Sequence, residues 1–186
     1  MIQSYKEYKQ YRAVESPRKT LKDWLLPGET NQFLKWLRLT ELCYNGGGIF
    51  RVLLPFAYLR YRRLSLQTGI HIPKNTCEKG LTLYHFGSIV VNAACKIGDN
   101  CCIMNNVNIG ANNGSLVAPK IGKNVYIGPG AVIFGEIEIA DGCYIGANAV
   151  VNKSFIEPNS VIVGVPAKVI KNDPVHWWEK NGLTRE

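Results

Sequence analysis

Histidine, acidic residues and long apolar runs are all scarce in this sequence. It has 3 histidines in 186 residues, and 14 acidic residues stand against 22 basic ones. The longest apolar run, residues 49–59, is interrupted by Arg51 and Pro55, and it is far shorter than the roughly 18 residues that span a bilayer. The sequence therefore predicts no transmembrane segment.

The six cysteines exclude further classes by their spacing. They form neither a C-x-x-C metal pattern nor the disulfide framework of a short secreted domain, and no cationic and apolar leader opens the chain. We therefore expect a cytoplasmic protein with reduced thiols. A hydrophobic content of 46% with 19% charged residues is ordinary for one globular domain with a small appendage.

The net charge of +8 could attract nucleic acid, an anionic membrane surface or a phosphorylated small molecule. Much of this charge lies in residues 1–66, in clusters such as Arg60, Arg62 and Arg63. Because no nucleic-acid motif accompanies the clusters, we expect no nucleic-acid partner. A solvated helix face or a contact with a neighbouring subunit is favoured over binding of DNA or lipid.

From about residue 70 onward an aliphatic residue recurs every six positions. Neither a helix, with apolar residues three and four apart, nor a simple alternating strand fits this period. Glycine often follows the aliphatic residue, and a compact residue often stands four places after it. The two unbroken series are Ile97, Ile103 and Ile109, and then Ile121, Ile127, Ile133, Ile139, Ile145 and Val151.

The period of six predicts a triangular solenoid, in which each hexapeptide forms a strand and a turn and three hexapeptides form one coil. The pairs Asp99-Asn100, Lys123-Asn124 and Asp141-Gly142 supply turn residues that tolerate left-handed backbone angles. We expect about five stacked coils at the spacing of parallel strands. The cysteines at compact positions are expected to pack inside rather than to react or bind metal; these are Cys95, Cys101 and Cys143.

The pattern divides the chain into a helical region (1–69), a solenoid (70–171) and a short C-terminal helix or tail (172–186). Apolar periodicity predicts one helix after Glu29 and a second that bends at Pro55 and ends at Gly69, and both should cap the open end of the solenoid. Between Ile109 and Ile121 the period skips one repeat. Residues 111–120 therefore predict a loop that leaves the prism, and we favour a functional role for it over a tolerated insertion.

The repeat resembles the left-handed parallel β-helix of hexapeptide-repeat acyltransferases over residues 70–171. The stretch GIHIPKNTCEKGLTLYHFGSIVVNAACKIGDNC (69–101) and the later VPAKVIK (165–171) are similar to the serine acetyltransferase branch of that superfamily. The resemblance implies a mainly β fold with a helical N-terminal cap. It also implies acetyl-CoA as co-substrate, no metal, and a homotrimer.

In that branch a histidine followed after one residue by glycine, and then by an aliphatic triplet, is the general base, and His85 occupies this place. A neutral imidazole can take the proton from an attacking hydroxyl near pH 7. The resemblance thus implies direct acetyl transfer in a ternary complex, with a backbone N–H at Gly110-Ala111 as the candidate donor to the oxyanion. His71 could hydrogen-bond to His85 and fix its tautomer, or it could face solvent.

The resemblance places acetyl-CoA between adjacent prisms. Small residues would let the pantetheine approach the backbone, and lysines would meet phosphate as point charges. For Gly128 and Ala147 an ordinary role in the repeat stays open. The matching positions are Ala111, Gly128, Pro129, Ala147, Asn152, Lys153, Lys168 and Lys171.

The acceptor is where this sequence departs from the branch. Acidic residues of the branch are replaced by His71 and Tyr84, and the arginine-histidine pair before Pro-Lys-Ile is replaced by Val117-Ala118. Free serine would then be held poorly, so we favour a sugar of a surface polysaccharide or its precursor. Amide side chains suit sugar hydroxyls, although several could simply form turns. The candidate acceptor contacts are Tyr84, Asn105, Asn106 and Asn112, in a cluster with Asn108 and Asn113.

Two other functions stay open. One is serine O-acetylation in cysteine biosynthesis, and the other is a noncatalytic β-helix that serves assembly. The carbonic-anhydrase version of this fold needs three histidine ligands, and the spacing of His71, His85 and His176 does not suit it.

Overall fold

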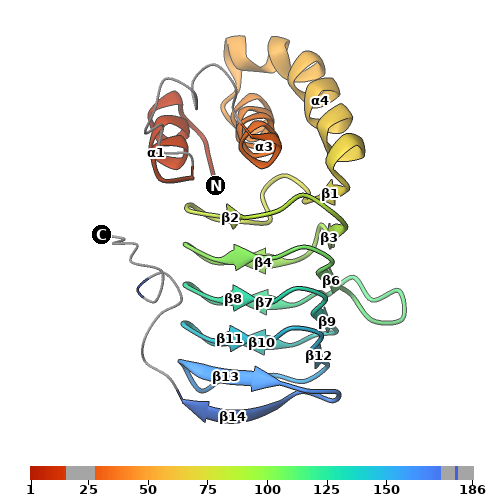
Figure 1. Cartoon of the computed structure of the whole chain (residues 1–186). Helices are drawn as coiled ribbons and strands as arrows, with labels where there is room; N and C mark the ends of the chain where they lie inside the picture. The colour runs from red at the N-terminus through yellow and green to blue at the C-terminus, as the bar shows by residue number, and fades with distance from the viewer. Residues whose placement is uncertain (16–27, 173–178, 180–186) are drawn as a thin grey trace.

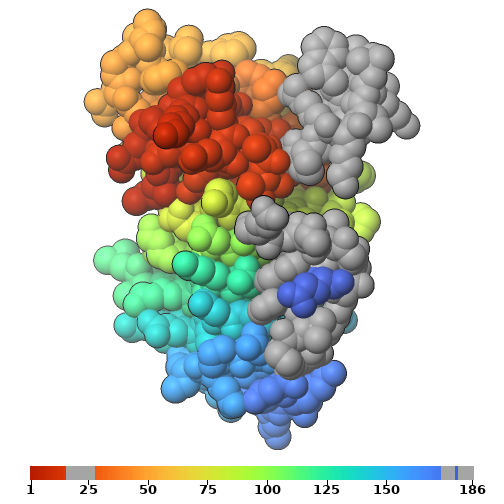
Figure 2. All heavy atoms as spheres, turned by 90° about the vertical axis from the view of Figure 1, so that its left-hand side faces the viewer, coloured from red at the N-terminus to blue at the C-terminus, as the bar shows by residue number. Residues whose placement is uncertain are grey.

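The computed structural model describes residues 1–15, 28–172 and 179. Within these ranges the chain begins with helices α1 (Tyr5–Glu15), α3 (Glu29–Asn45) and α4 (Gly48–Thr68). Figure 1 shows the helices together at one end of a prism of short strands, and Figure 2 shows the coils following one another below them. The expected C-terminal helix falls on residues that, apart from Glu179, lie outside the described part of the chain.

The strands form the three faces of the prism. Face A is a parallel sheet of β1 (Ile70–His71), β3 (Ile89–Val91), β6 (Asn108–Gly110), β9 (Val132–Phe134) and β12 (Val150–Val151). Face B contains β4 (Lys96–Ile97), β7 (Lys120–Ile121) and β10 (Glu138–Ile139). Face C contains β2 (Thr82–Leu83), β5 (Cys102–Ile103), β8 (Tyr126–Ile127), β11 (Tyr144–Ile145), β13 (Ser160–Val163) and the antiparallel β14 (Lys168–Asn172).

The aliphatic residues of the six-residue repeat fill the interior of the prism, as the sequence predicts. Each of the nine positions is at most 4% exposed. Equivalent residues stack in register from coil to coil, for example Ile103 beside Ile127 and Ile127 beside Ile145. The five strands of face A agree with the expected number of coils. The compact positions Cys95, Cys101 and Cys143 are buried as well.

The corners of the prism use the turn residues that the sequence indicates. Asn100, Asn124 and Gly142 have φ angles of 57°, 61° and 71° between faces B and C. A second column at the corner between faces C and A has the same conformation at Asn106 and Asn148, with φ angles of 59° and 55°. Asparagine tolerates this left-handed region better than most residues, so the repeat can turn sharply without a glycine at every corner.

The helices cover the end of the prism with a shared apolar core. Phe33, Leu37 and Tyr61 belong to the same buried cluster as Ile70 and Ile72 of the first coil. Helix α4 runs through Pro55 as one element and ends at Gly69, whose φ is 72°. The capping role and the end at Gly69 therefore agree with the sequence, whereas helix α1 had no separate prediction.

A buried ionic network fastens two of the helices to the first coil. The Arg38 guanidinium donates to the carboxylates of Glu15 at 2.7 Å and Glu41 at 2.8 Å. It also donates to the backbone carbonyls of Cys77 and Glu78, both at 2.8 Å. The three charged side chains are at most 2% exposed. Because Arg38 satisfies groups on α1, α3 and the prism together, the three parts depend on one another.

We predict that Arg38→Met lowers the free energy of unfolding by about 3–5 kcal/mol, because it leaves two buried carboxylates without their partner. Chemical denaturation followed by circular dichroism would measure the loss. The matched control is Lys120→Met, which removes the exposed Lys120–Glu138 pair at 3.0 Å and should cost less than about 1 kcal/mol. Equal losses in the two variants would contradict this account of the cap.

Candidate active site

Several of the predicted site residues lie one above another along the corner where the chain passes from face C to face A, which we call the CA edge. Leu83, Ile103, Ile127 and Ile145 are paired in register on face C. The residues two places later therefore occupy equivalent positions in successive coils. They are His85, Asn105, Pro129 and Ala147. Backbone hydrogen bonds from Gly130 to the Asn105 carbonyl and from Asn148 to the Pro129 carbonyl tie these turns together.

His85 is exposed at the helical end of the CA edge, between the exposed aromatic residues Tyr84 and Phe86. Its ring is thus accessible to a substrate rather than enclosed in the stack. His71 is also exposed, on the outer side of face A, where it pairs in register with Val90. Among the described residues no hydrogen bond joins the two imidazoles. An orienting role for His71 stays a prediction.

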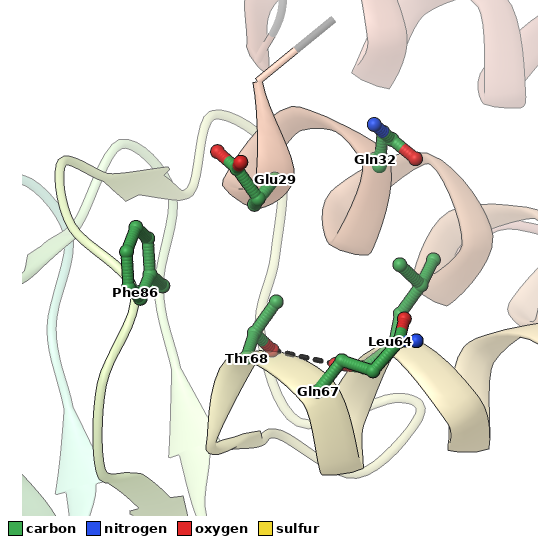
Figure 3. Close-up of a pocket in the computed structure, with 6 residues that line it drawn as sticks. All are labelled: Glu29, Gln32, Leu64, Gln67, Thr68 and Phe86. Carbon is green, nitrogen blue, oxygen red and sulfur yellow. Dashed lines mark hydrogen bonds between the residues drawn. The ribbon is translucent and has the colours of Figure 1, made fainter.

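A hollow of 210 Å³ opens beside the His85 turn, between the helices and the prism (Figure 3). Phe86, the residue after His85, lines one side, and Leu64 and Gln67 of α4 line the other. Glu29 and Gln32 come from the start of α3. The hollow therefore offers an aromatic ring, a carboxylate and two amides next to the turn that contains His85, although His85 itself is not among the lining residues.

The hollow was not predicted from the sequence. Only Phe86 carries a signal, because it follows His85 directly. Glu29 marks a helix start in the sequence, and its position near His85 follows from how α3 packs against α4. Thr68 in the same hollow is satisfied internally, since its hydroxyl donates to the Leu64 carbonyl at 2.7 Å.

A second group of predicted residues lies at the other edge of face A, where the chain passes to face B. Gly110 ends β6 and pairs in register with Phe134, and Asn152 with Lys153 follows β12. Ala111 and Asn112 begin the excursion, which leaves the prism between β6 and β7 as predicted (Figure 1). In one chain, face A separates this edge from His85. The expected pairing of His85 with an oxyanion donor at Gly110-Ala111 is thus not present within a single copy.

Two of the predicted phosphate-binding lysines meet at the end of the prism away from the helices. Lys153 and Lys168 line one hollow of 410 Å³, together with Ser154, Ser160 and Glu157. Lys153 also lies over the ring of Phe155 at 5.5 Å. Lys171 is exposed on the same terminal strand, β14. The Ser160 hydroxyl donates to the Glu157 carbonyl at 2.8 Å. The hollow therefore offers a phosphate two lysine charges and the Ser154 hydroxyl, beside one carboxylate.

Two of the predicted site residues, Gly128 and Asn106, have structural roles in the repeat. A Cβ on Gly128 would lie 2.8 Å from the Ala147 backbone nitrogen, so glycine is required there by the stacking of the coils alone. Asn106 has the left-handed backbone of a corner, which gives it a turn role. Asn105 and Asn112 lie at different edges of face A and do not form one cluster within the chain.

Ala118 behind the excursion is 3% exposed and packs in the core. It therefore leaves only Val117 of the replaced pair at the surface. Among the described residues no three histidine, cysteine or carboxylate side chains gather as a metal site would need. The described helices also include none that is both long and apolar enough to cross a membrane.

Comparison with known proteins gives one matching family model, the bacterial transferase hexapeptide (six repeats), over residues 118–153. A serine acetyltransferase of Buchnera aphidicola is 39% identical over 119 residues, which cover 62% of this chain and 45% of the relative. A serine acetyltransferase of Mycobacterium tuberculosis is 34% identical over 120 residues, or 63% of this chain and 52% of the relative. The chain thus spans about half the length of these relatives.

Solved structures give the same result over more of the chain. The serine acetyltransferase of Brucella abortus is 29% identical with a TM-score of 0.73, and the match covers 90% of this chain and 70% of that one. The same enzyme in complex with coenzyme A is 30% identical with a TM-score of 0.68, over 90% and 66% of the two chains. Soybean serine acetyltransferase complexed with serine is 26% identical with a TM-score of 0.69, over 88% and 67%.

These matches confirm the predicted fold class, a left-handed parallel β-helix with a helical N-terminal cap. The six-residue repeat, the three-faced prism and the similarity over most of the chain agree with one another. The chain therefore belongs to the hexapeptide-repeat acyltransferase superfamily, in its serine acetyltransferase-like branch.

Proposed function

We propose that this protein is an acetyl-CoA-dependent O-acetyltransferase in which His85 is the general base. The observation that carries the proposal is the exposed His85 ring at the head of the CA edge, in line with Asn105, Pro129 and Ala147. The next residue, Phe86, lines the neighbouring hollow. The imidazole would accept the proton of the acceptor hydroxyl as its oxygen forms a bond to the acetyl carbon. The same proton would then pass to the departing thiolate, so that no acetyl-enzyme is needed.

The residues present fit a long coenzyme with phosphates at one end. Pro129 and Ala147 place compact side chains on the CA edge beyond His85, and the lysine-lined hollow lies at the far end of the prism. A relative of this fold has been solved in complex with coenzyme A. When bound, the coenzyme would supply the thioester, and Lys153 and Lys168 would hold phosphate.

The two edges of face A suggest that the site is shared between copies. The base lies at one edge, and the predicted oxyanion donor and Lys153 lie at the other. Side-by-side packing of prisms, as in the expected homotrimer, would bring the CA edge of one copy to the opposite edge of its neighbour. Each site would then take His85 from one copy and Gly110 with Lys153 from the next.

Serine is the first candidate acceptor, because the named relatives are serine acetyltransferases and one has been solved with serine. The Glu29 carboxylate in the hollow beside His85 could pair with an amino acid's ammonium group. A sugar hydroxyl is the second candidate. It is favoured by the apolar Val117-Ala118 pair in the excursion, which offers nothing to grip a carboxylate.

We expect His85→Ala to lower kcat by on the order of 10²–10⁴-fold, because the variant lacks the group that takes the hydroxyl proton. A thiol-release assay with acetyl-CoA and a panel of serine, galactosides and nucleotide sugars would measure it. The KM for acetyl-CoA should change little. Full activity in a folded His85→Ala variant on every acceptor that the wild type uses would exclude this role and favour a noncatalytic assembly protein.

A mixture of His85→Ala and Lys153→Glu chains tests the shared site. Each variant alone should be nearly inactive, whereas co-refolded mixtures should recover activity in about a quarter of the sites, since each of two neighbours must be the right parent. Separately refolded chains, mixed afterwards, are the control. No recovery in co-refolded mixtures that do assemble would show that each site lies within one chain.

Glu29→Gln separates the two acceptor classes. If the acceptor is serine, loss of the carboxylate should raise the KM for serine about tenfold, because a charge-assisted hydrogen bond becomes a neutral one. A neutral sugar should show a much smaller change. Glu136→Gln, an exposed carboxylate beyond the excursion, is the matched control. An unchanged KM for serine would remove Glu29 from the acceptor site.

A further inference from the structure

One exposed side of α4 carries a row of large apolar side chains. Figure 1 shows α4 along the outside of the helical end, far from β14. Five apolar residues at helical spacing have side chains that are between 49% and 74% exposed. They are Ile49, Val52, Leu53, Phe56 and Leu59, and we call them the α4 outer face.

Within residues 1–15 and 28–172, these five side chains stay largely exposed. An adjacent side of α4 is buried through Ala57, Tyr61 and Leu64, and the last two belong to the core cluster that includes α3 and the first coil. Only Phe56 of the outer face has a described ring contact, with Trp36 at 5.6 Å between centroids. One apolar side of α4 packs in the core and a second is exposed. An exposed apolar side of this kind is typical of an interaction surface rather than of a helix face in contact with water.

The charge of α4 limits what can cover that surface. The helix contains four arginines and no acidic residue. Arg51, Arg62 and Arg63 are exposed, and Arg60 lies over the Trp36 ring at 5.4 Å. Arg63 stands seven residues after Phe56, so it follows the outer face along the same side of the helix.

A symmetric contact between the α4 outer faces of two copies would not suit this arrangement. A symmetric contact between two α4 helices would bring arginines of both copies together, and α4 offers no carboxylate to pair them. An anionic lipid surface suits it better. Apolar side chains can enter the boundary of the acyl chains, while arginines contact the headgroups.

We propose that the α4 outer face docks on an anionic membrane surface and holds the protein there as a peripheral protein. From the sequence we favoured a solvated helix face or a subunit contact for the early basic clusters over binding of DNA or lipid. The exposed apolar side chains beside them lead us to propose lipid instead. The proposal does not depend on acetyl transfer. It requires only the helical end of the molecule and would stand if the acetyltransferase function failed.

Flotation of the full chain with vesicles tests this proposal. The wild type should bind vesicles of phosphatidylcholine with phosphatidylglycerol and should bind phosphatidylcholine alone much less. Val52→Gln, Phe56→Gln and Leu59→Gln together should lower binding by about tenfold or more, because less apolar area enters the lipid. Arg51→Gln, Arg62→Gln and Arg63→Gln together should remove the preference for anionic vesicles, and about 0.5 M salt, with a Debye length of about 4 Å, should weaken wild-type binding.

Leu116→Gln is the matched control, because Leu116 is 92% exposed but lies in the excursion, far along the chain from α4. It should bind as the wild type does. Circular dichroism melts would show that the triple variants remain folded. Absence of wild-type binding to anionic vesicles would overturn the proposal. Self-association that is lost in the apolar triple variant, without vesicle binding, would identify a second copy as the occupant instead.

Discussion

The structure depends on keeping one aliphatic side chain of every hexapeptide inside a narrow prism. Each of these side chains stacks on its equivalent in the next coil, so a shift of one residue would turn the whole series outward. The parallel ladders hold this register with backbone hydrogen bonds that repeat from coil to coil. Turns with left-handed asparagines make the corners sharp enough for the interior to be filled by single side chains. A rigid scaffold results, and short turns can be positioned along its edges.

The candidate site uses that rigidity. Residues six positions apart along the chain lie on successive faces of the prism, whereas residues one coil apart lie directly above one another. The CA edge therefore collects His85, Asn105, Pro129 and Ala147 into one column from four separate turns. The helical end adds the hollow beside His85, and its position depends on the buried Arg38 network that joins α1, α3 and the first coil. Burial raises the pKa of the Glu15 carboxyl even beside that guanidinium, because the whole network is shielded from water.

The same geometry explains why one chain does not contain the whole predicted site. Face A lies between the edge that bears His85 and the edge that bears Gly110 and Lys153, because the chain runs across the face before it turns. The two edges are therefore far apart within one chain, although the residues on them belong to nearby repeats. A neighbouring prism can bring its second edge next to His85, and this is the physical basis of the shared site that we propose.

The sequence by itself determined the period, the inward residues, the corner residues and the excursion, because a six-residue repeat has only one way to bury its aliphatic side chains in a three-sided coil. The local motif around His85, through its resemblance to serine acetyltransferases, also predicted the candidate base. Tertiary structure alone decided which predicted residues share an edge, that Gly128 is required for close stacking, and that Glu29 lines the hollow near His85. It also decided that the outer face of α4 stays exposed. These features depend on how coils stack and helices pack over long sequence separations, and the local spacing of residues does not encode such distances.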